Sequence, residues 1–327
     1  MIISRTPVRM SFVGGGSDMA SFYEQSPGAV LSTTINKYIY VTLNPKFDGG
    51  IRVGYSRNED VKTLEEVEHP IVRNTLGMMG CPSGVEITTI ADVPSKGTGL
   101  GSSSTFTVGL LNAVSAYQGR GRGKKWLARK ACEVEIDLCG EPIGKQDQYA
   151  AAYGGFNVFE FLSDGKVRTT PVMMSQDTCK RLHENVMLFY TGITRSASSI
   201  LAAQSTEMSG KKEKFDVMCE MVKQVPVLKD VLESGNLDDF GRILHEAWLM
   251  KRSLVKGISN SSFDDMYAAA RNAGATGGKI LGAGAGGFLM VYAERDKQDA
   301  VAAALSDLKQ VDIKFDNLGS QIICNYQ

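Results

Sequence analysis

Three glycine-rich segments hold the residues of this sequence whose types and spacing could support chemistry. The chain has 35 glycines among its 327 residues, above the average usage of about 7%. Glycine costs backbone entropy on folding, and it is useful where φ is positive or where backbone must closely approach a ligand. Twelve of the 35 lie in segments 12–18, 94–105 and 277–287, as Gly14, Gly15, Gly16, Gly97, Gly99, Gly101, Gly277, Gly278, Gly282, Gly284, Gly286 and Gly287. We therefore expect these segments to form loops at a ligand site.

The middle segment, Pro-Ser-Lys-Gly-Thr-Gly-Leu-Gly-Ser-Ser-Ser-Thr at 94–105, follows an expected strand and leads into an expected helix. Its free backbone N–H groups and the positive helix end would converge, which predicts an anion site. It is not a Walker A loop, because no Gly-Lys-Ser/Thr follows Gly97 at the required spacing, and Ser102 replaces the third glycine of a GxGxxG motif. The hydroxyls of Ser102, Ser103 and Ser104 could bind phosphate or Mg²⁺. The competing interpretation is a flexible loop capped by serine, a favoured N-cap residue.

The last segment does satisfy GxGxxG, at Gly282, Gly284 and Gly287. A dinucleotide fingerprint requires a strand, then the glycines, then a helix. Here the glycines lead directly into the strand-like Phe-Leu-Met-Val-Tyr at 288–292. We therefore discount NAD binding and expect a loop that lets backbone approach a ligand, with a glycine-rich strand crossing as the alternative.

The elements that must position these segments follow from local patterns. Runs rich in β-branched and aromatic residues predict strands at 2–13, 29–43, 50–55, 85–90, 154–160 and 186–190. Helical spacing predicts helices at 105–117, 125–139 and, with breaks at Pro226 and 234–236, across 197–273. The chain closes with a strand at 288–292, a helix at 297–308 and strands at 311–315 and 321–324. Because regular βαβ alternation is lacking, an α+β fold is favoured, with a soft domain boundary between 169 and 182.

Composition narrows the function classes. The balance of 36 Lys and Arg against 36 Asp and Glu, with 43% hydrophobic residues, argues against a nucleic-acid coat protein, a binder of anionic membranes and a disordered chain. The six cysteines form no CxxC pair and the N-terminus resembles no targeting segment, so we expect a reduced, cytoplasmic protein. The uncharged run 97–119 is too polar to span a bilayer. The basic segment 119–130, which includes Trp126, leaves RNA binding as an alternative.

Three motifs together resemble those of the GHMP kinases, small-molecule kinases that include galactokinase, homoserine kinase and mevalonate kinase. The motifs are Pro-Val-Arg at 7–9 followed by Gly-Gly-Gly-Ser-Asp at 14–18, Pro94 with Gly-Leu-Gly-Ser-Ser-Ser at 99–104, and Gly-Ala-Gly-Ala-Gly-Gly at 282–287. The resemblance implies two α+β domains, which we expect at 1–176 and 177–327. The first would be similar to the second domain of ribosomal protein S5 and the second would be ferredoxin-like, with the active site between them.

The resemblance also implies an ATP- and Mg²⁺-dependent phosphotransferase. In Gly-Lys-Gln-Asp-Gln, Asp147 matches the catalytic base, and Arg9 could hold it ionised through its opposite charge. Glu135 and Ser103 match the Mg²⁺ ligands, and two suffice because water and phosphate complete the octahedron around Mg²⁺. The middle glycine segment would bind ATP through Pro94, Ser95, Lys96, Gly97, Thr98, Gly99, Leu100, Gly101, Ser102, Ser103 and Ser104.

Each of these roles has a structural alternative. Asp147 could be a satisfied turn carboxylate, Glu135 a solvated helix residue, and Arg9 a partner in a plain salt bridge. Glu133 could be mistaken for the metal ligand, but at 3.6 residues per turn it lies about 200° around an α-helix from Glu135. Only one of the two can therefore face the site.

The acceptor pocket is expected at the first and last glycine segments. By resemblance, Asp18 would bind sugar hydroxyls, and the galactokinase pattern Gly-Glu-His-Thr-Asp becomes Gly-Gly-Gly-Ser-Asp at 14–18. The loss of two bulky side chains leaves room for a sugar larger than galactose. A phosphate on that sugar would need cations to bind it. The first candidates are Lys145 and Arg195, and the second are Lys279 and Arg252. A solvated surface charge is an equally good explanation for each of them. The expected acceptor-binding residues are Gly15, Gly16, Ser17, Asp18, Lys145, Arg195, Gly284, Ala285 and Gly286.

Two further segments concern the acceptor itself. The residues Gly-Lys-Gln-Asp-Gln-Tyr-Ala-Ala-Ala-Tyr-Gly-Gly-Phe-Asn at 144–157 and Leu-His-Glu-Ala-Trp at 244–248 look most like the D-glycero-D-manno-heptose 7-phosphate kinases of the family. This resemblance implies transfer of the γ-phosphoryl group of ATP to the anomeric 1-OH, giving the 1,7-bisphosphate. The alternative is an L-fucokinase- or galactokinase-like enzyme that acts on an unphosphorylated sugar. A nicotinamide-dependent oxidoreductase or an RNA-binding protein is a more distant alternative function. We expect ATP and a sugar phosphate as partners, no nucleic acid and no membrane, with a homodimer left open.

Overall fold

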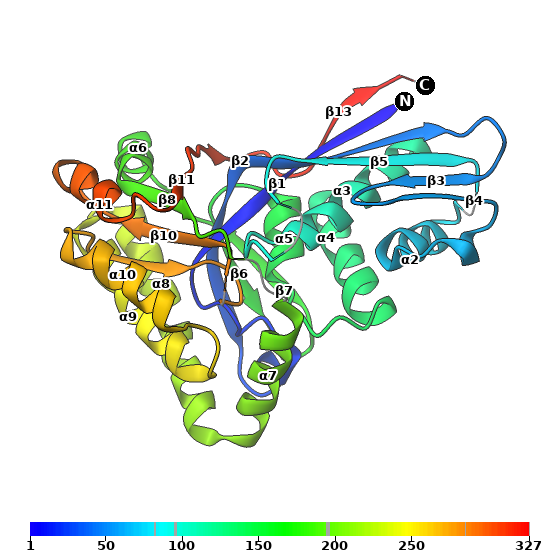
Figure 1. Ribbon diagram of the computed structural model, residues 1–327. Coiled ribbons are helices and arrows are strands. Elements are labelled where there is room, and N and C mark those ends of the chain that lie inside the picture. Colours follow the sequence, from blue (N-terminus) through cyan, green and yellow to red (C-terminus); the bar gives the residue numbers. More distant parts are fainter. Residues whose placement is uncertain (82, 95–96, 194–196, 285, 327) are drawn as a thin grey trace.

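Two β-sheets of unequal size organise the chain in the structure, a computed structural model that describes residues 1–81, 83–94, 97–193, 197–284 and 286–326. Figure 1 shows the larger sheet running toward both chain termini and the smaller one beside a group of long helices. Helices and strands mix without βαβ alternation, so the expected α+β class is confirmed.

The centre of the larger sheet is a pair of long antiparallel strands, β1 (Ile2–Val13) and β2 (Gly28–Pro45). Both are rich in β-branched residues, which favour pleated backbone. Among the described residues, the other strands of this sheet are β3 (Ile51–Gly54), β4 (Asn58–Val61), β5 (Val85–Ala91), β6 (Asn157–Phe161), β7 (Val167–Pro171), β12 (Phe315–Asp316) and β13 (Gln321–Asn325). Strand β2 pairs with β1, β5, β6 and β12, and therefore joins the parts of the sheet.

Helices cover one face of the larger sheet (Figure 1). The central one, α3 (Ser102–Tyr117), is buried on nearly every side and packs on β1 and β2. A Cβ atom on Gly109 would lie 2.9 Å from Oγ1 of Thr6, so this glycine allows α3 to approach the sheet closely. Helices α2 (Pro70–Met79), α4 (Lys124–Cys132) and α5 (Gln146–Tyr153) pack around it. This part of the chain also includes the short helix α1 (Ala20–Tyr23) and a 3₁₀ turn (Leu64–Glu66).

The helix expected at 125–139 changes its geometry halfway. After α4 the chain continues as a π-helical turn, Glu133–Leu138. Such turns are rare and are frequent at functional sites. Here the turn buries Glu135 completely, while Glu133 stays at the surface and pairs with Lys130 at 2.6 Å. The expectation that only one of the two glutamates faces the interior is confirmed, although the backbone is not the α-helix assumed.

The smaller sheet has the order β11-β8-β10-β9 and is antiparallel throughout its described residues. Its strands are β8 (Val186–Tyr190), β9 (Gly277–Ile280), β10 (Phe288–Tyr292) and β11 (Lys309–Gln310). Numbered along the chain, this is the order 4-1-3-2, with helices between the first and second and between the third and fourth strands. A βαββαβ arrangement of this kind is ferredoxin-like, as expected.

The connection between the first two strands of the smaller sheet, β8 and β9, contains several helices instead of one. Between β8 and β9 lie α7 (Ala197–Gly210), α8 (Lys212–Ser234), α9 (Asp238–Leu254) and α10 (Ser261–Asn272). Helix α6 (Gln176–Asn185) precedes β8, and a 3₁₀ turn (Arg295–Lys297) leads into α11 (Gln298–Ala304). Helices α7 and α9 turn toward the larger sheet and contribute to the cavity described below.

Several expectations about elements were wrong. Helix α8 continues through Pro226, which is exposed, so that water can satisfy the carbonyl group that loses its N–H partner, while buried Val225 and Leu228 anchor the helix. The strand expected at 311–315 is reduced to β12. Strands β4, β7 and β9 and helices α2, α5 and α6 were not expected, because short or polar elements give weak periodic signals.

The end of the chain returns to the larger sheet. Strand β12 pairs with β2, and β13 pairs with β1. The domain boundary between residues 176 and 177 stays a prediction. The topology shows in addition that β12 and β13, near the end of the chain, belong to the larger sheet.

All six cysteines are in the described residues and are unpaired thiols. None of the described helices is both long and apolar enough to cross a membrane.

Candidate active site

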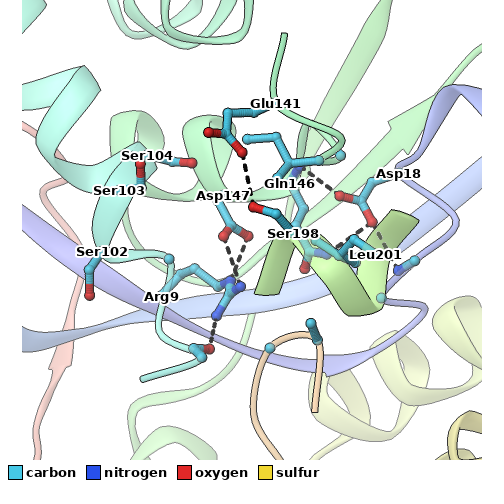
Figure 2. Close-up of a pocket in the computed structure, with 18 of the residues that line it drawn as sticks. Arg9, Asp18, Ser102, Ser103, Ser104, Glu141, Gln146, Asp147, Ser198 and Leu201 are labelled. Carbon is cyan, nitrogen blue, oxygen red and sulfur yellow. Dashed lines mark hydrogen bonds and ion pairs between the residues drawn. The ribbon is translucent and has the colours of Figure 1, made fainter. Parts of the chain in front are cut away.

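A cavity of about 610 Å³ lies where the larger sheet and its helices meet the helices of the smaller sheet. Its walls come from segments 15–18, 97–104 and 282–283, from residues between 135 and 147, and from helices α7 and α9. Figure 2 shows the labelled side chains of Arg9, Asp18, Asp147 and Ser198 around this space. All three glycine-rich segments therefore meet at one site, as the sequence predicted.

The middle and last glycine segments touch through their backbones. A Cβ atom on Gly99 would lie 2.2 Å from the carbonyl oxygen of Leu281, and one on Gly282 would lie 2.5 Å from Cα of Gly99. A Cβ on Gly287 would lie 2.0 Å from the oxygen of Thr98. All three glycines have positive φ angles. This contact explains why both segments need glycine, and it is the close backbone crossing that the structural alternative predicts. Gly282 and Ala283 also line the cavity, as a loop that approaches a ligand would.

The amino end of α3 opens toward the cavity. The residue before the helix, Gly101, has φ +75°, and no side chain caps the first turn. Its leading N–H groups lack partners within the helix and carry the positive end of the helix dipole. Ser102, Ser103 and Ser104 belong to this first turn and line the cavity. The loop capped by serine is therefore ruled out, and the geometry is that of an anion site.

Arg9 and Asp147 form a paired contact at the cavity wall. Nε of Arg9 donates to Oδ1 of Asp147 at 2.8 Å, and a second guanidinium nitrogen donates to Oδ2 at 2.9 Å. Arg9 also donates to the carbonyl oxygen of Gly99, which ties the pair to the glycine loop. The Arg9 side chain is 5% exposed, whereas that of Asp147 keeps 23%, open to the cavity. Burial raises the pKa of Asp147, and Arg9 opposes that shift.

Glu135 lies beneath the first turn of α3 and is completely buried. Its Oε1 accepts a hydrogen bond from Ser103 at 2.8 Å, and its Oε2 accepts one from Gln148 at 2.7 Å. Burial raises the pKa of Glu135 to about 7, although hydrogen bonds from Ser104, Ser103 and Gln148 favour the charged form. Within the described part of the chain, no cation lies within ion-pair distance of it. It is not the solvated helix residue of the alternative interpretation.

Asp18, another carboxylate that lines the cavity, is held by hydrogen-bond donors from two segments of the chain. Its Oδ1 accepts from the backbone N–H of Gly16 and from Nε2 of Gln146, both at 2.9 Å, and its Oδ2 accepts from the backbone N–H of Gln146 at 3.1 Å. Figure 2 shows Gln146 reaching Asp18 while its neighbour Asp147 reaches Arg9. A Cβ on Gly144 would lie 1.9 Å from Oδ2 of Asp18, so glycine is required there.

Several expected site residues lie elsewhere. The ammonium of Lys145 points into a second hollow, where it donates to the oxygen of Gly165 at 2.9 Å and lies over the ring of Tyr23. Ser17 is fully buried and bonds the oxygens of Gly14 and Ala29. Leu100 belongs to the hydrophobic core, and Pro94, Gly284 and Gly286 do not line the cavity. Ser95, Lys96, Arg195 and Ala285 fall outside the described residues.

The two other cations expected to bind a substrate phosphate, Arg252 and Lys279, also lie outside the cavity. Arg252 pairs with Asp264 at 2.7 Å, and Lys279 is buried with its ammonium on the oxygen of Phe12 at 3.1 Å. Their directions depend on how α9 and β9 pack, which a local pattern does not contain.

Other cavity residues were missed from the sequence, notably Lys251 of α9. It is 5% exposed and follows Leu244, Ala247 and Trp248 on the buried face of its helix. A lysine continuing an apolar helical stripe is the signal that could have found it. Glu141, Gln146, Ser198 and Leu201 also line the cavity, and Ser198 of α7 donates to Glu141 at 2.9 Å.

An uncapped helix end suited to an anion, a carboxylate held by arginine and a second, buried carboxylate share one cavity, and a kinase of small molecules needs parts of this kind. Comparison with known proteins agrees with this class. The model of the GHMP kinases N terminal domain matches residues 63–155, and that of the GHMP kinases C terminal matches residues 228–310. The chain belongs to the GHMP kinase family, and is an ATP-dependent phosphotransferase. The two-domain α+β fold of that family is confirmed.

The similar proteins include enzymes named for heptose phosphates. The chain is 30% identical to D-glycero-alpha-D-manno-heptose 7-phosphate kinase of Campylobacter jejuni over 93% of each protein. A solved structure of a D-glycero-D-manno-heptose 1-phosphate kinase from Bacteroides thetaiotaomicron is 27% identical, with a TM-score of 0.83 over the whole of both chains. The bifunctional fucokinase/GDP-fucose pyrophosphorylase of Arabidopsis thaliana is 25% identical over 95% of this chain and 32% of its own length.

Proposed function

We propose that this protein transfers the γ-phosphoryl group of ATP to the anomeric 1-OH of D-glycero-D-manno-heptose 7-phosphate, giving the 1,7-bisphosphate. The full-length similarity to the heptose 7-phosphate kinase of C. jejuni supports the choice of acceptor. The observation that carries the chemistry is the paired contact of Arg9 with Asp147, beside the open amino end of α3.

The phosphates of ATP bind at the first turn of α3 in this proposal. Free N–H groups of that turn and the hydroxyls of Ser102, Ser103 and Ser104 supply donors, and the helix dipole favours negative charge. The glycine loop packs closely against Leu281 at Gly99, which would help to position these donors before the nucleotide arrives. Binding therefore needs no net positive charge on the protein, whose formal net charge is zero.

Asp147 accepts the proton of the acceptor hydroxyl as phosphoryl transfer proceeds. Each oxygen of its carboxylate accepts one hydrogen bond from Arg9 and keeps a lone pair for the cavity. Burial raises its pKa, which makes it a stronger base, while Arg9 keeps it ionised and fixes its orientation. Both effects suit general base catalysis.

Glu135 and Ser103 fit a Mg²⁺ site. A completely buried carboxylate with only neutral hydrogen-bond donors among the described residues is costly unless a cation balances it. Glu135 and Ser103 would hold the ion, and the ion would neutralise charge on the phosphates.

The acceptor sugar binds next to Asp18 in this proposal. The Asp18 carboxylate is fixed by Gly16 and Gln146 and can accept hydrogen bonds from sugar hydroxyls. Gly15 lines the cavity without a side chain, which leaves space for a larger sugar, whereas the space beside Gly16 is filled by Gln204 and Lys251. The alternative, supported by similarity to the A. thaliana fucokinase, is an unphosphorylated sugar such as L-fucose or galactose.

One assay tests the acceptor and the position together. The purified protein is given ATP, Mg²⁺ and, in turn, the heptose 7-phosphate, the free heptose, L-fucose and galactose, and both ADP and reducing ends are measured. Phosphorylation of the anomeric hydroxyl removes the reducing end, so we expect ADP to appear as reducing ends disappear, fastest with the heptose 7-phosphate. ADP formed without loss of reducing ends would place the phosphate on another hydroxyl. Preference for L-fucose or galactose would support the alternative.

A further inference from the structure

Lys251 is a buried cation of the cavity to which the catalytic proposal gives no role. It lies on the apolar face of α9, is 5% exposed and lines the cavity. Its ammonium donates to the carbonyl oxygen of Gly15 and to Oε1 of Gln204, both at 2.9 Å. Both acceptors are neutral, and in the part of the chain that the structure describes no carboxylate lies within ion-pair distance. Because an ammonium has three donors, one N–H stays available.

Gln204 of α7 contacts Lys251. It is completely buried, and its Nε2 has no hydrogen-bond partner among the described residues. The orientation of the amide is set by Lys251, which needs Oε1 as an acceptor. A Cβ on Gly16 would lie 2.1 Å from Nε2 of Gln204 and 3.1 Å from Nζ of Lys251. Both side chains therefore lie against the loop that borders the acceptor pocket, with Lys251 lining the cavity and Gln204 buried behind it.

A buried cation without a charged partner is costly unless a ligand supplies the missing oxygen. Burial lowers the pKa of Lys251 to about 8, against the opposing effect of Asp18, so the ammonium is mostly charged at neutral pH. An anion in the cavity would accept from the remaining N–H of Lys251 and balance its charge, and a phosphate group has this chemistry. Gln204, behind Lys251, holds the ammonium in place.

The position of Lys251 indicates which phosphate this is. Lys251 donates to Gly15, and the backbone N–H of the next residue, Gly16, donates to Asp18. Asp147 lies instead beside the start of α3, where a Cβ on Gly101 would be 2.9 Å from its Oδ2. The nucleotide phosphates belong to the Glu135 end, at α3. A sugar whose reacting hydroxyl faces Asp147 and whose ring lies along Asp18 would point its far end toward Lys251.

We infer that Lys251, held in place by Gln204, binds the phosphate that the acceptor sugar carries at the end opposite the reacting hydroxyl. This inference rests on the proposed function and replaces Lys145 as the residue for that phosphate, since Lys145 points into another hollow. Lys279 is buried as well, but its ammonium bonds Phe12 and does not line the cavity. The site would select phosphorylated over unphosphorylated sugars.

The test compares two acceptors in the wild type and in Lys251→Met, which keeps an unbranched side chain but removes the charge. The acceptors are D-glycero-D-manno-heptose 7-phosphate and the same heptose without phosphate. We expect kcat/KM for the phosphorylated acceptor to fall about 100-fold, mostly through KM, and kcat/KM for the free heptose to change less than about threefold. Arg242→Met removes an exposed cation of the same helix, already paired with Asp239 and Glu246, and should change neither value.

A second variant guards against an effect of packing alone. Gln204→Glu keeps the shape of the side chain and places a carboxylate beside Lys251, so we expect it to weaken the phosphorylated acceptor selectively as well. An equal loss on both acceptors in Lys251→Met, or no loss on either, would overturn the inference while leaving the proposed function intact. A wild type that turns over only unphosphorylated sugars would overturn both.

Discussion

Arg9 holds both carboxylate oxygens of Asp147, at 2.8 and 2.9 Å, although 138 positions separate the two residues along the chain. Strand β1 carries Arg9 and the first turn of α5 carries Asp147. Arg9 also contacts the oxygen of Gly99. One side chain thus positions both the carboxylate that we propose as the base and the glycine loop that we propose for the nucleotide.

Asp147→Asn should abolish most of the turnover. The amide cannot accept a proton from the acceptor hydroxyl, and removal of a general base typically costs about 10²- to 10⁴-fold in rate. Affinity for ATP, measured separately by calorimetry, should stay close to that of the wild type, because the nucleotide phosphates bind at α3. Turnover near the wild-type level would show that Asp147 is not the base.

Glu135→Gln should raise the Mg²⁺ requirement at least about tenfold, because a buried carboxylate that would hold the ion becomes neutral. Titration of activity with Mg²⁺ at saturating ATP measures this. Glu133→Gln is a matched control on the same π-helical turn, since Glu133 pairs with Lys130 at the surface, and its titration should be unchanged. Identical titrations for both variants would remove Glu135 from the metal site.

Gly99→Ala should impair the nucleotide loop beyond the effect of backbone strain. Its Cβ would lie 2.2 Å from the oxygen of Leu281, in addition to the strain of φ +72°. Gly119→Ala has a similar φ of +69° and no atom within 4 Å, so it should lose only about 1–2 kcal/mol of unfolding free energy. We expect Gly99→Ala to lose more stability and to raise KM for ATP about tenfold or more. Equal behaviour of the two variants would contradict the close contact.

Lys279→Met should reduce the pH dependence of stability. Burial, together with the charges of Lys251 and Arg9, lowers the pKa of Lys279 from 10.5 to about 7. Between these values the unfolded chain binds a proton that the folded chain does not, so the free energy of unfolding rises with pH, by up to about 1.4 kcal/mol per pH unit.

Thermal or denaturant unfolding of the ligand-free protein at pH 7 and pH 9 tests this. The wild type should gain stability relative to Lys279→Met over that interval. Lys223→Met, which removes an exposed lysine paired with Glu220, should follow the wild type. Parallel curves for wild type and Lys279→Met would mean that Lys279 stays charged in the folded protein.

Much of the site could be predicted from local patterns. The loop at 97–101 needs glycines with positive φ, and the helix that begins at Ser102 follows it directly, so both features are visible in a short stretch of sequence. The roles of Asp147 and Glu135 came from motif resemblance, and the structure brings both to the cavity region. The π-helical turn that buries Glu135 could not be predicted, because spacing rules assume regular α-helix.

By itself, then, the sequence determined where the chain turns, where an anion-binding helix end begins and which family motifs it carries, because these depend on residues close together in the chain. Only the tertiary structure decided which side chains share the cavity. The consecutive residues Lys145, Gln146 and Asp147 reach Gly165, Asp18 and Arg9 respectively. Lys251 enters from a distant helix. The direction of each side chain is set by packing between elements far apart in sequence, and no local pattern records it.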